Sequence, residues 1–274
     1  MSKLYIIGNG FDLKHDLPSS YYDFAKFCKT TNCELFETIN LLFPQISIEN
    51  LWSNFEEGLG QVDLKRLYDF FYIPYKANIR DDKFLELQEK LRLCFRDWVI
   101  SLKKLTGNLQ KHYVFDDNDC FVSFNYTDTL ETGYDIKSNR ILHIHGFAKS
   151  EDEDFYADYL FGHKQSPQKT EENSDSFDYL SKDLINSLRK DFQIQQLEDK
   201  ICLWKKDCIT LEKIVVLGHS LNEIDDDYMQ ELITLLPNIP WFVEYLDYED
   251  KCHKMNNIVR NGIAKHSQVV FIKS

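Results

Sequence analysis

Four stretches of the sequence place glycine, amide or imidazole groups directly after an apolar run. They are Gly8-Asn9-Gly10, Asn125, His145 and Gly218-His219-Ser220. Closely spaced glycines let the backbone approach a phosphate, a carboxamide both donates and accepts hydrogen bonds, and an imidazole exchanges protons near neutral pH. Because ligands bind at the carboxyl ends of parallel strands, these stretches predict a polar ligand site with an acid–base group in it.

Each of these groups also has a purely structural explanation. A tight turn alone can require G-x-G, and Leu13 stands where the dinucleotide pattern G-x-G-x-x-G needs its third glycine. Asn125 could cap a helix that starts at the next residue, and His145 could be a core histidine. Ser220 and Asp225 could cap the helix expected after the fourth strand. The four strand ends taken together therefore carry more information than any one of them.

A metal site is a further alternative. His143 and His145 are two residues apart on a predicted strand, so both side chains face the same side and could bind one metal ion. No third ligand is fixed by spacing. We therefore expect no metal, and a metal-dependent hydrolase that uses these two histidines remains an alternative.

The elements that must position these groups follow from apolar patterning. Six short apolar runs lack strict alternation, which is typical of strands buried on both faces of a parallel sheet. Helical patterns cover 81–105, 222–236 and 249–262. Alternating strands and helices predict an α/β fold with a doubly wound, mostly parallel, Rossmann-like sheet. The predicted strands are 3–8, 119–124, 140–145, 213–218, 241–246 and 268–272.

Two long segments interrupt the pattern. Most of the chain between the first and second strands looks helical, and we expect 33–110 to be a helical insertion within a single domain, 1–274. Residues 148–180 are acidic and nearly without aliphatic periodicity, which predicts a solvated loop, with a lid as the alternative.

Composition excludes several classes of protein. A formal net charge of −13 argues against general binding to nucleic acid. The seven cysteines are scattered and never spaced C-x-x-C, which argues against a disulfide framework and favours a reducing compartment. No signal pattern follows the first methionine, and no apolar run approaches the length of a membrane span. We expect a cytoplasmic protein that does not bind membranes.

Five segments together resemble a known family. GNGFDLKHDLPSSYYDF, LWSNFEEGL, SFNYTDTLE, ILHIHG and VVLGHSLNEIDDDY are similar to the AbiH-type phage abortive-infection proteins. The same series is similar, more distantly, to the sirtuin-like NAD-binding fold. That resemblance implies a sirtuin-like domain in which Asn125 and His145 take the catalytic positions and NAD is the substrate. It also implies a dinucleotide site, to which we assign Gly8, Asn9, Gly10, Phe11, Asp12, Pro18, Gly218, Ser220 and Asp225.

The sequence departs from the sirtuin pattern at several points. The zinc-binding cysteine pairs are absent, which argues for NAD cleavage and against protein deacylation. Asp12 stands where sirtuins have a serine, and Thr127 stands where an aspartate usually follows the catalytic asparagine by two. Asp12 could bind a ribose hydroxyl, stabilise the sugar cation or cap its own turn.

The function that follows is an antiphage effector that hydrolyses NAD at the nicotinamide–ribose bond. Asn125 would position water or ribose, and His145 would act as the base. The alternative from another class is a nucleotide-sensing module that binds NAD without cleaving it and acts through a partner. A toxic activity needs restraint, which a homo-oligomer or a defence-system partner protein could supply.

Overall fold

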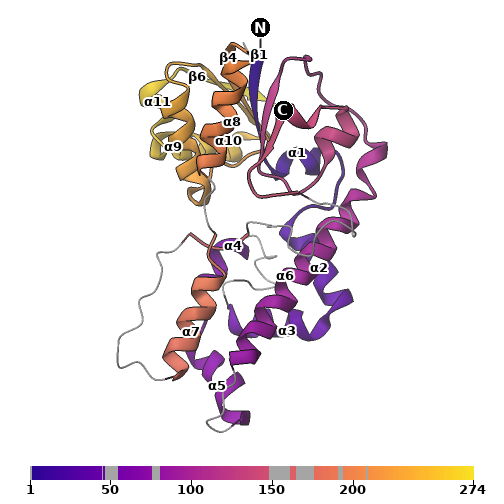
Figure 1. The fold of residues 1–274 in the computed structure, drawn as a ribbon, viewed down its shortest axis with the longest axis vertical. Helices are drawn as coiled ribbons and strands as arrows, with labels where there is room; N and C mark the ends of the chain where they lie inside the picture. The colour runs from indigo at the N-terminus through magenta and orange to yellow at the C-terminus, as the bar shows by residue number, and fades with distance from the viewer. Residues whose placement is uncertain are drawn as a thin grey trace. The chain divides into compact units, whose positions relative to one another are not determined.

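A computed structural model describes residues 2–44, 46, 55–75, 81–147, 161–164, 176–190, 194–207 and 209–274 (Figure 1). The chain divides into two compact units. The first comprises Met1–Pro18, Leu102–Leu160 and Phe192–Ser274, and the second comprises Ser19–Ser101 and Phe161–Asp191. Most of the predicted acidic loop, 148–180, lies outside the described residues.

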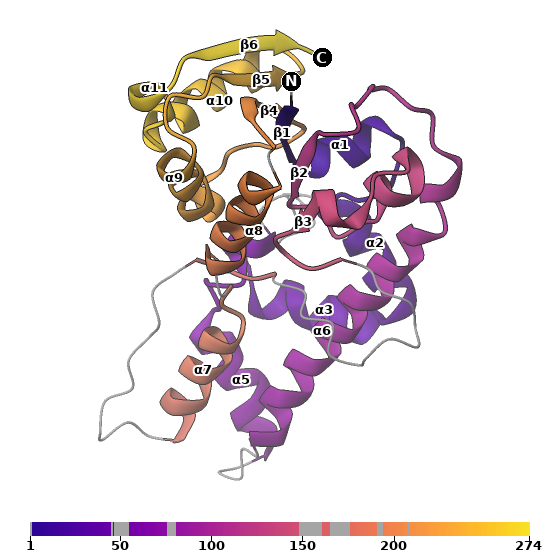
Figure 2. The ribbon, with the colours of Figure 1, turned by 45° about the horizontal axis from the view of Figure 1, so that its top comes forward.

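The first unit is built on one parallel sheet of six strands. The strand order is β3-β2-β1-β4-β5-β6, so the chain moves outward in one direction from β1 and then returns to the other side of it (Figure 2). This order confirms the predicted doubly wound, Rossmann-like fold and makes the β1/β4 pair its topological switch point. The strands are β1 (Ser2–Ile7), β2 (Cys120–Ser123), β3 (Ile141–His143), β4 (Leu211–Leu217), β5 (Trp241–Tyr245) and β6 (Val269–Lys273).

Side chains on β1 show why the sheet is covered on both faces. Leu4 and Ile6 belong to one apolar cluster, whereas Tyr5 and Ile7 belong to another. Successive strand residues point to opposite faces, so the unbroken apolar run of β1 contributes side chains to both cores. The burial of both faces explains why the strand sequences do not alternate.

Helices from different parts of the chain supply the two cores. The first core takes buried residues from α8 (Ile194–Lys206), α9 (Asp226–Leu235), α10 (Tyr248–Arg260) and α11 (Ile263–His266). The second takes Phe11 from α1 (Asn9–Lys14), together with Leu130 from a π-helical turn, η2 (Thr129–Gly133). The predicted helices at 222–236 and 249–262 correspond to α9, with its leading 3₁₀ turn η4 (Glu223–Asp225), and to α10. Two more 3₁₀ turns, η1 (Thr106–Asn108) and η3 (Ser138–Arg140), lie in this unit.

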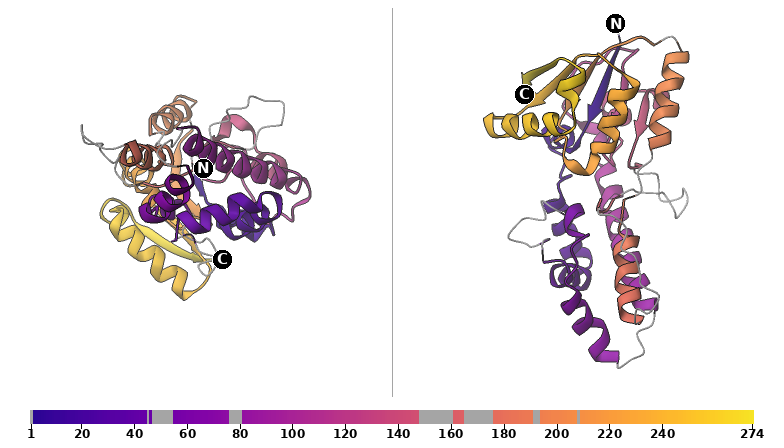
Figure 3. Two further views of the ribbon diagram at one scale, coloured as in Figure 1. Left: turned by 90° about the horizontal axis from the view of Figure 1, so that it is seen from below. Right: turned by 90° about the vertical axis from the view of Figure 1, so that its left-hand side faces the viewer.

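The second unit is helical (Figure 3). Aromatic side chains form its core: the Phe24 ring contacts the rings of Phe55, Phe95 and Trp98 at centroid distances of 5.2–5.3 Å. Ser20 starts the first of its helices with a capping box to Asp23. The helices are α2 (Tyr21–Thr31), α3 (Cys33–Leu42), α4 (Phe55–Gly58), α5 (Leu64–Tyr75), α6 (Asp81–Lys103) and α7 (Ser176–Ser187).

The turn after β1 packs directly against the end of β4. The Gly8 N–H donates to Leu217 O at 3.0 Å, and the Gly10 N–H donates to Gly218 O at 2.8 Å. A Cβ atom on Gly8 would lie 2.5 Å from His219 Cα, and one on Gly218 would lie 2.0 Å from the Phe11 nitrogen. The glycines in this turn are therefore required by contact between two backbone segments.

Gly218→Ala should destabilise the protein much more than Gly262→Ala. Both glycines have left-handed φ angles, +63° and +77°, but the space around Gly262 is open whereas Gly218 faces backbone. We expect a loss of about 1–2 kcal/mol at Gly262 from the left-handed conformation alone. At Gly218 the clash should add about 2–3 kcal/mol or more. Urea unfolding measures both, and equal losses would show that the close contact is unimportant.

Candidate functional site

Asp12 is a buried carboxyl group at the carboxyl edge of the sheet. It lies in the first turn of α1 and is 1% exposed. The Thr127 hydroxyl donates to Oδ2 at 2.6 Å, and the Thr129 hydroxyl donates to Oδ1 at 2.8 Å. Burial raises the pKa of Asp12 to about 6, although both hydroxyls pull it down. Asp12 therefore changes protonation close to neutral pH.

Asn125, which follows β2, presents a buried carboxamide beside this carboxyl group. Among the described residues, neither its Oδ1 nor its Nδ2 has a hydrogen-bond partner, and the residue is 5% exposed. It lies near enough to Asp12 to lower the pKa of that carboxyl group, but the two side chains are not in hydrogen-bonding geometry. The expectation that Asn125 caps a helix is wrong, because no helix starts at the next residue.

His145, which follows β3, faces Asp225 in the 3₁₀ turn η4. Its Nε2 is 3.5 Å from Asp225 Oδ1, and the two side chains are 5% and 10% exposed. Asp225 Oδ2 is 3.5 Å from Nε2 of a second imidazole, His219. The Phe124 ring packs edge-on against both imidazoles, at centroid distances of 5.2 Å and 4.4 Å. Asp225 precedes α9 but makes no capping hydrogen bond with its side chain, so its carboxylate serves the histidines.

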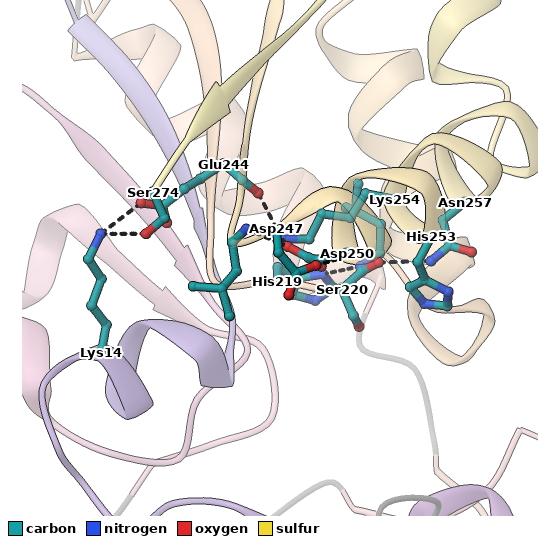
Figure 4. A network of polar contacts seen from close by, with 12 residues as sticks. Lys14, His219, Ser220, Glu244, Asp247, Asp250, His253, Lys254, Asn257 and Ser274 are labelled. Atoms are coloured by element: carbon teal, nitrogen blue, oxygen red, sulfur yellow. Dashed lines mark hydrogen bonds and ion pairs between the residues drawn. The ribbon is translucent and has the colours of Figure 1, made fainter.

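A polar network from α10 borders this site (Figure 4). The Asn257 carboxamide donates to Ser220 O at 2.9 Å, and the buried Lys254 ammonium donates to Glu244 O at 2.7 Å. Lys14 on α1 reaches Glu244 Oε1 at 3.0 Å. The loop after β4 and the end of β5 are thus tied to helices on either side.

His143 has different partners from His145. Its Nε2 is 2.8 Å from Glu131 Oε1, and its ring stacks on Phe147 at 4.5 Å. Within the described part of the chain, no three His, Cys, Asp or Glu side chains gather into a group that could hold a metal ion. The two histidines therefore face different carboxylates, Glu131 and Asp225.

The predicted dinucleotide residues lie in unlike surroundings. Gly8 and Phe11 are buried, and the Phe11 ring stacks on Tyr113 in the core. Asn9 and Pro18 are exposed. The N–H groups of Gly10 and Phe11, two residues assigned to the dinucleotide site, already donate to the carbonyls of Gly218 and Gly8. The prediction that these residues bind a dinucleotide stays a prediction.

The structure brings the predicted residues into two neighbouring groups and adds others to them. Asp12 and Asn125 lie together, as do His145 and Asp225. Sequence reasoning assigned no role to Thr129, His219 or Leu221. The role of Thr129 had no usable signal, because the chain bends at Thr127 and a π-helical turn starts at Thr129, so the period-two rule of strands does not apply there. The role of His219 depends on a fold of the loop that no spacing predicts.

The sheet order and the polar groups at its carboxyl edge define a Rossmann-like α/β protein. In the described residues, none of the helices combines the length and apolar character needed to cross a membrane. Residues 4–245 match the sequence model of the family named Bacteriophage abortive infection AbiH, and the chain belongs to that family. The comparison with individually curated proteins gave no match.

Asp12→Asn should stabilise the protein at neutral pH but not at pH 4. The pKa of Asp12 is about 6 in the folded protein against an ordinary 3.8. The folded state therefore holds its proton more tightly, and ionisation destabilises it as the pH rises through that window. Across pH 4 to 7, the stability gained by the variant relative to the wild type should grow by about 2–3 kcal/mol.

Thermal or urea unfolding at several pH values measures this difference. Asp117→Asn is the matched control, because Asp117 is exposed. A gain from Asp12→Asn that does not change between pH 4 and 7 would contradict a raised pKa for Asp12.

Proposed function

We propose that this AbiH-family protein acts in phage abortive infection by hydrolysing NAD at the nicotinamide–ribose bond. The family supplies the abortive-infection role. The chemistry is our proposal, and it rests on the side chains at the carboxyl edge of the sheet.

The buried carboxamide of Asn125, which has no hydrogen-bond partner among the described residues, carries the proposal. Buried polar groups are nearly always hydrogen-bonded, and each exception in a native structure calls for an explanation. Asn125 lies at the end of β2, next to the β1/β4 switch point where ligands bind in this fold. A ligand with hydroxyl groups or an ordered water would satisfy both atoms of the carboxamide, since it donates and accepts.

The chemistry of NAD cleavage suits the groups around Asn125. Nicotinamide leaves as a neutral molecule, so the reaction needs little acid catalysis, and the sugar passes through a cation resembling that of glycosidases. Asn125 would hold the attacking water or a ribose hydroxyl, and His145 would take a proton, with Asp225 stabilising the positive ring. Such proton transfer is worth about 10²–10⁴-fold in rate. In this proposal the Asp12 carboxylate would stabilise the sugar cation electrostatically.

The contact between Asp12 and Thr127 gives further support. These are the two positions at which the sequence departs from the sirtuin pattern, which has a serine and an aspartate there. In this protein the Thr127 hydroxyl donates to the Asp12 carboxylate at 2.6 Å. The two positions thus still combine one hydroxyl with one carboxylate, in the reverse order along the chain, and here the two groups are hydrogen-bonded.

The glycine turn would serve the ligand in a different way from the one the sequence suggests. The Gly10 and Phe11 N–H groups are bonded to carbonyls. We therefore propose that the glycine turn lets NAD approach the backbone closely, and that other donors bind the pyrophosphate of NAD. We place the activity in the cytoplasm, with restraint supplied by self-association or by a partner protein.

Asn125→Ala should abolish NAD hydrolysis and leave the fold intact. The substitution removes a carboxamide that makes no hydrogen bond within the described part of the chain, so stability should change by less than about 1 kcal/mol. The rate should fall at least about 100-fold. Incubation of the purified protein with NAD, followed by identification of nicotinamide and ADP-ribose, measures it.

Asn256→Ala, at an exposed position of α10, is the matched control and should keep full activity. Wild-type protein that binds NAD and leaves it uncleaved, also in cells infected by phage, would support the nucleotide-sensing alternative.

A further inference from the structure

A second imidazole shares the carboxylate that faces His145. One oxygen of Asp225 is turned to His145 Nε2 and the other to His219 Nε2, each at 3.5 Å. The His219 side chain is 4% exposed, so water screens this arrangement little. The distances are long for hydrogen bonds, as catalytic contacts often are before the substrate binds.

The backbone fixes which nitrogen of His219 carries the proton. The Leu221 N–H donates to His219 Nδ1 at 2.9 Å. A ring nitrogen that accepts a hydrogen bond holds no proton, so the neutral ring carries its proton on Nε2. That N–H lies 3.5 Å from Asp225 Oδ2, so His219 can donate to the carboxylate.

The loop after β4, which contains His219 and Leu221, has a strained backbone, and side chains from the end of α10 and the residue after it hold it in place. Leu221 has a φ of 57°, which is unusual for a bulky residue and costs about 1–3 kcal/mol. Its carbonyl accepts from Arg260 Nη2 at 2.9 Å and from Asn261 Nδ2 at 3.4 Å. Arg260 also binds both carboxylate oxygens of Asp226 at 2.9 Å. Strain that the surrounding structure maintains in this way is a feature of functional sites.

We propose that His219 is a positioning residue that holds the Asp225 carboxylate against His145. Its catalytic consequence rests on the proposed function. As water forms its bond to the ribose carbon, nicotinamide leaves with the electrons of the C–N bond, and His145 takes a proton from the water. Asp225, fixed by His219, stabilises the resulting imidazolium, which later releases the proton to solvent.

Nuclear magnetic resonance of the full chain with ¹⁵N-labelled histidine tests the arrangement without any substrate. In the wild type, the nitrogen shifts of the neutral His219 ring should report the proton on Nε2. Asp225→Asn should move the titration midpoint of His145 to lower pH by about one to two units. Among the described residues, Tyr126 and Tyr228 also lie beside the His145 ring, and His219 faces the same carboxylate; the substitution leaves all three in place.

Glu131→Gln is the matched control. It removes the carboxylate from a separate pair, with His143, and should leave the His145 midpoint unchanged. A His219 proton on Nδ1, or a His145 midpoint that Asp225→Asn does not move, would overturn the proposal. If the Asp225 variant does not fold, the His219 tautomer measured in the wild type still tests the proposal.

Kinetics test the catalytic consequence separately. His219→Phe should lower kcat for NAD hydrolysis up to about 100-fold, through misplacement of the groups that act on the substrate, with little change in KM. His219→Gln can still present an N–H near the position of Nε2 and should recover most of the rate. Equal losses in both variants would overturn the positioning role. The two claims can fail separately. If the tautomer and titration results are as expected but the wild-type protein does not cleave NAD, the proposed function is refuted and the arrangement of His219 and Asp225 still holds.

Discussion

The contact between the β1–α1 turn and the end of β4 determines most of the arrangement at the carboxyl edge. Gly8, Gly10 and Gly218 allow two backbone segments to approach so closely that a Cβ atom on any of them would lie within 3.0 Å of a heavy atom. His219 thereby lies directly over Gly8, at the start of the loop that leads to Asp225. The same turn begins α1 and sets Asp12 beside the threonines that follow β2.

Polar groups are buried at this edge under conditions that oppose stability. The carboxyl group of Asp12 is held where burial raises its pKa to about 6, and the carboxamide of Asn125 lacks hydrogen bonds among the described residues. Leu221 adds backbone strain. Each feature opposes folding, and the remaining sheet is an ordinary apolar core. Stability given up in one small region is typical of a site that binds or reacts with a ligand.

The AbiH family gives the biological setting, phage abortive infection, and the side chains suggest a chemistry for it. Two carboxylates have distinct surroundings: Asp12 receives two hydroxyl groups, whereas Asp225 faces two imidazoles. Unlike environments give similar groups different roles in acid–base chemistry. We assign proton transfer to the side of His145 and electrostatic stabilisation to the side of Asp12.

Apolar patterning predicted the six strands, their parallel arrangement in an α/β fold and the polar groups at the strand ends, because burial on both faces leaves a local apolar signature. The sequence also named Asp12, Asn125, His145 and Asp225 as candidate site residues. Tertiary structure alone decided which of them meet. Thr127 and Asp12 are 115 residues apart in the chain, and the tautomer of His219 depends on the backbone of Leu221. Such contacts depend on how the loops pack against one another, and the periodicity of the sequence does not predict loop packing.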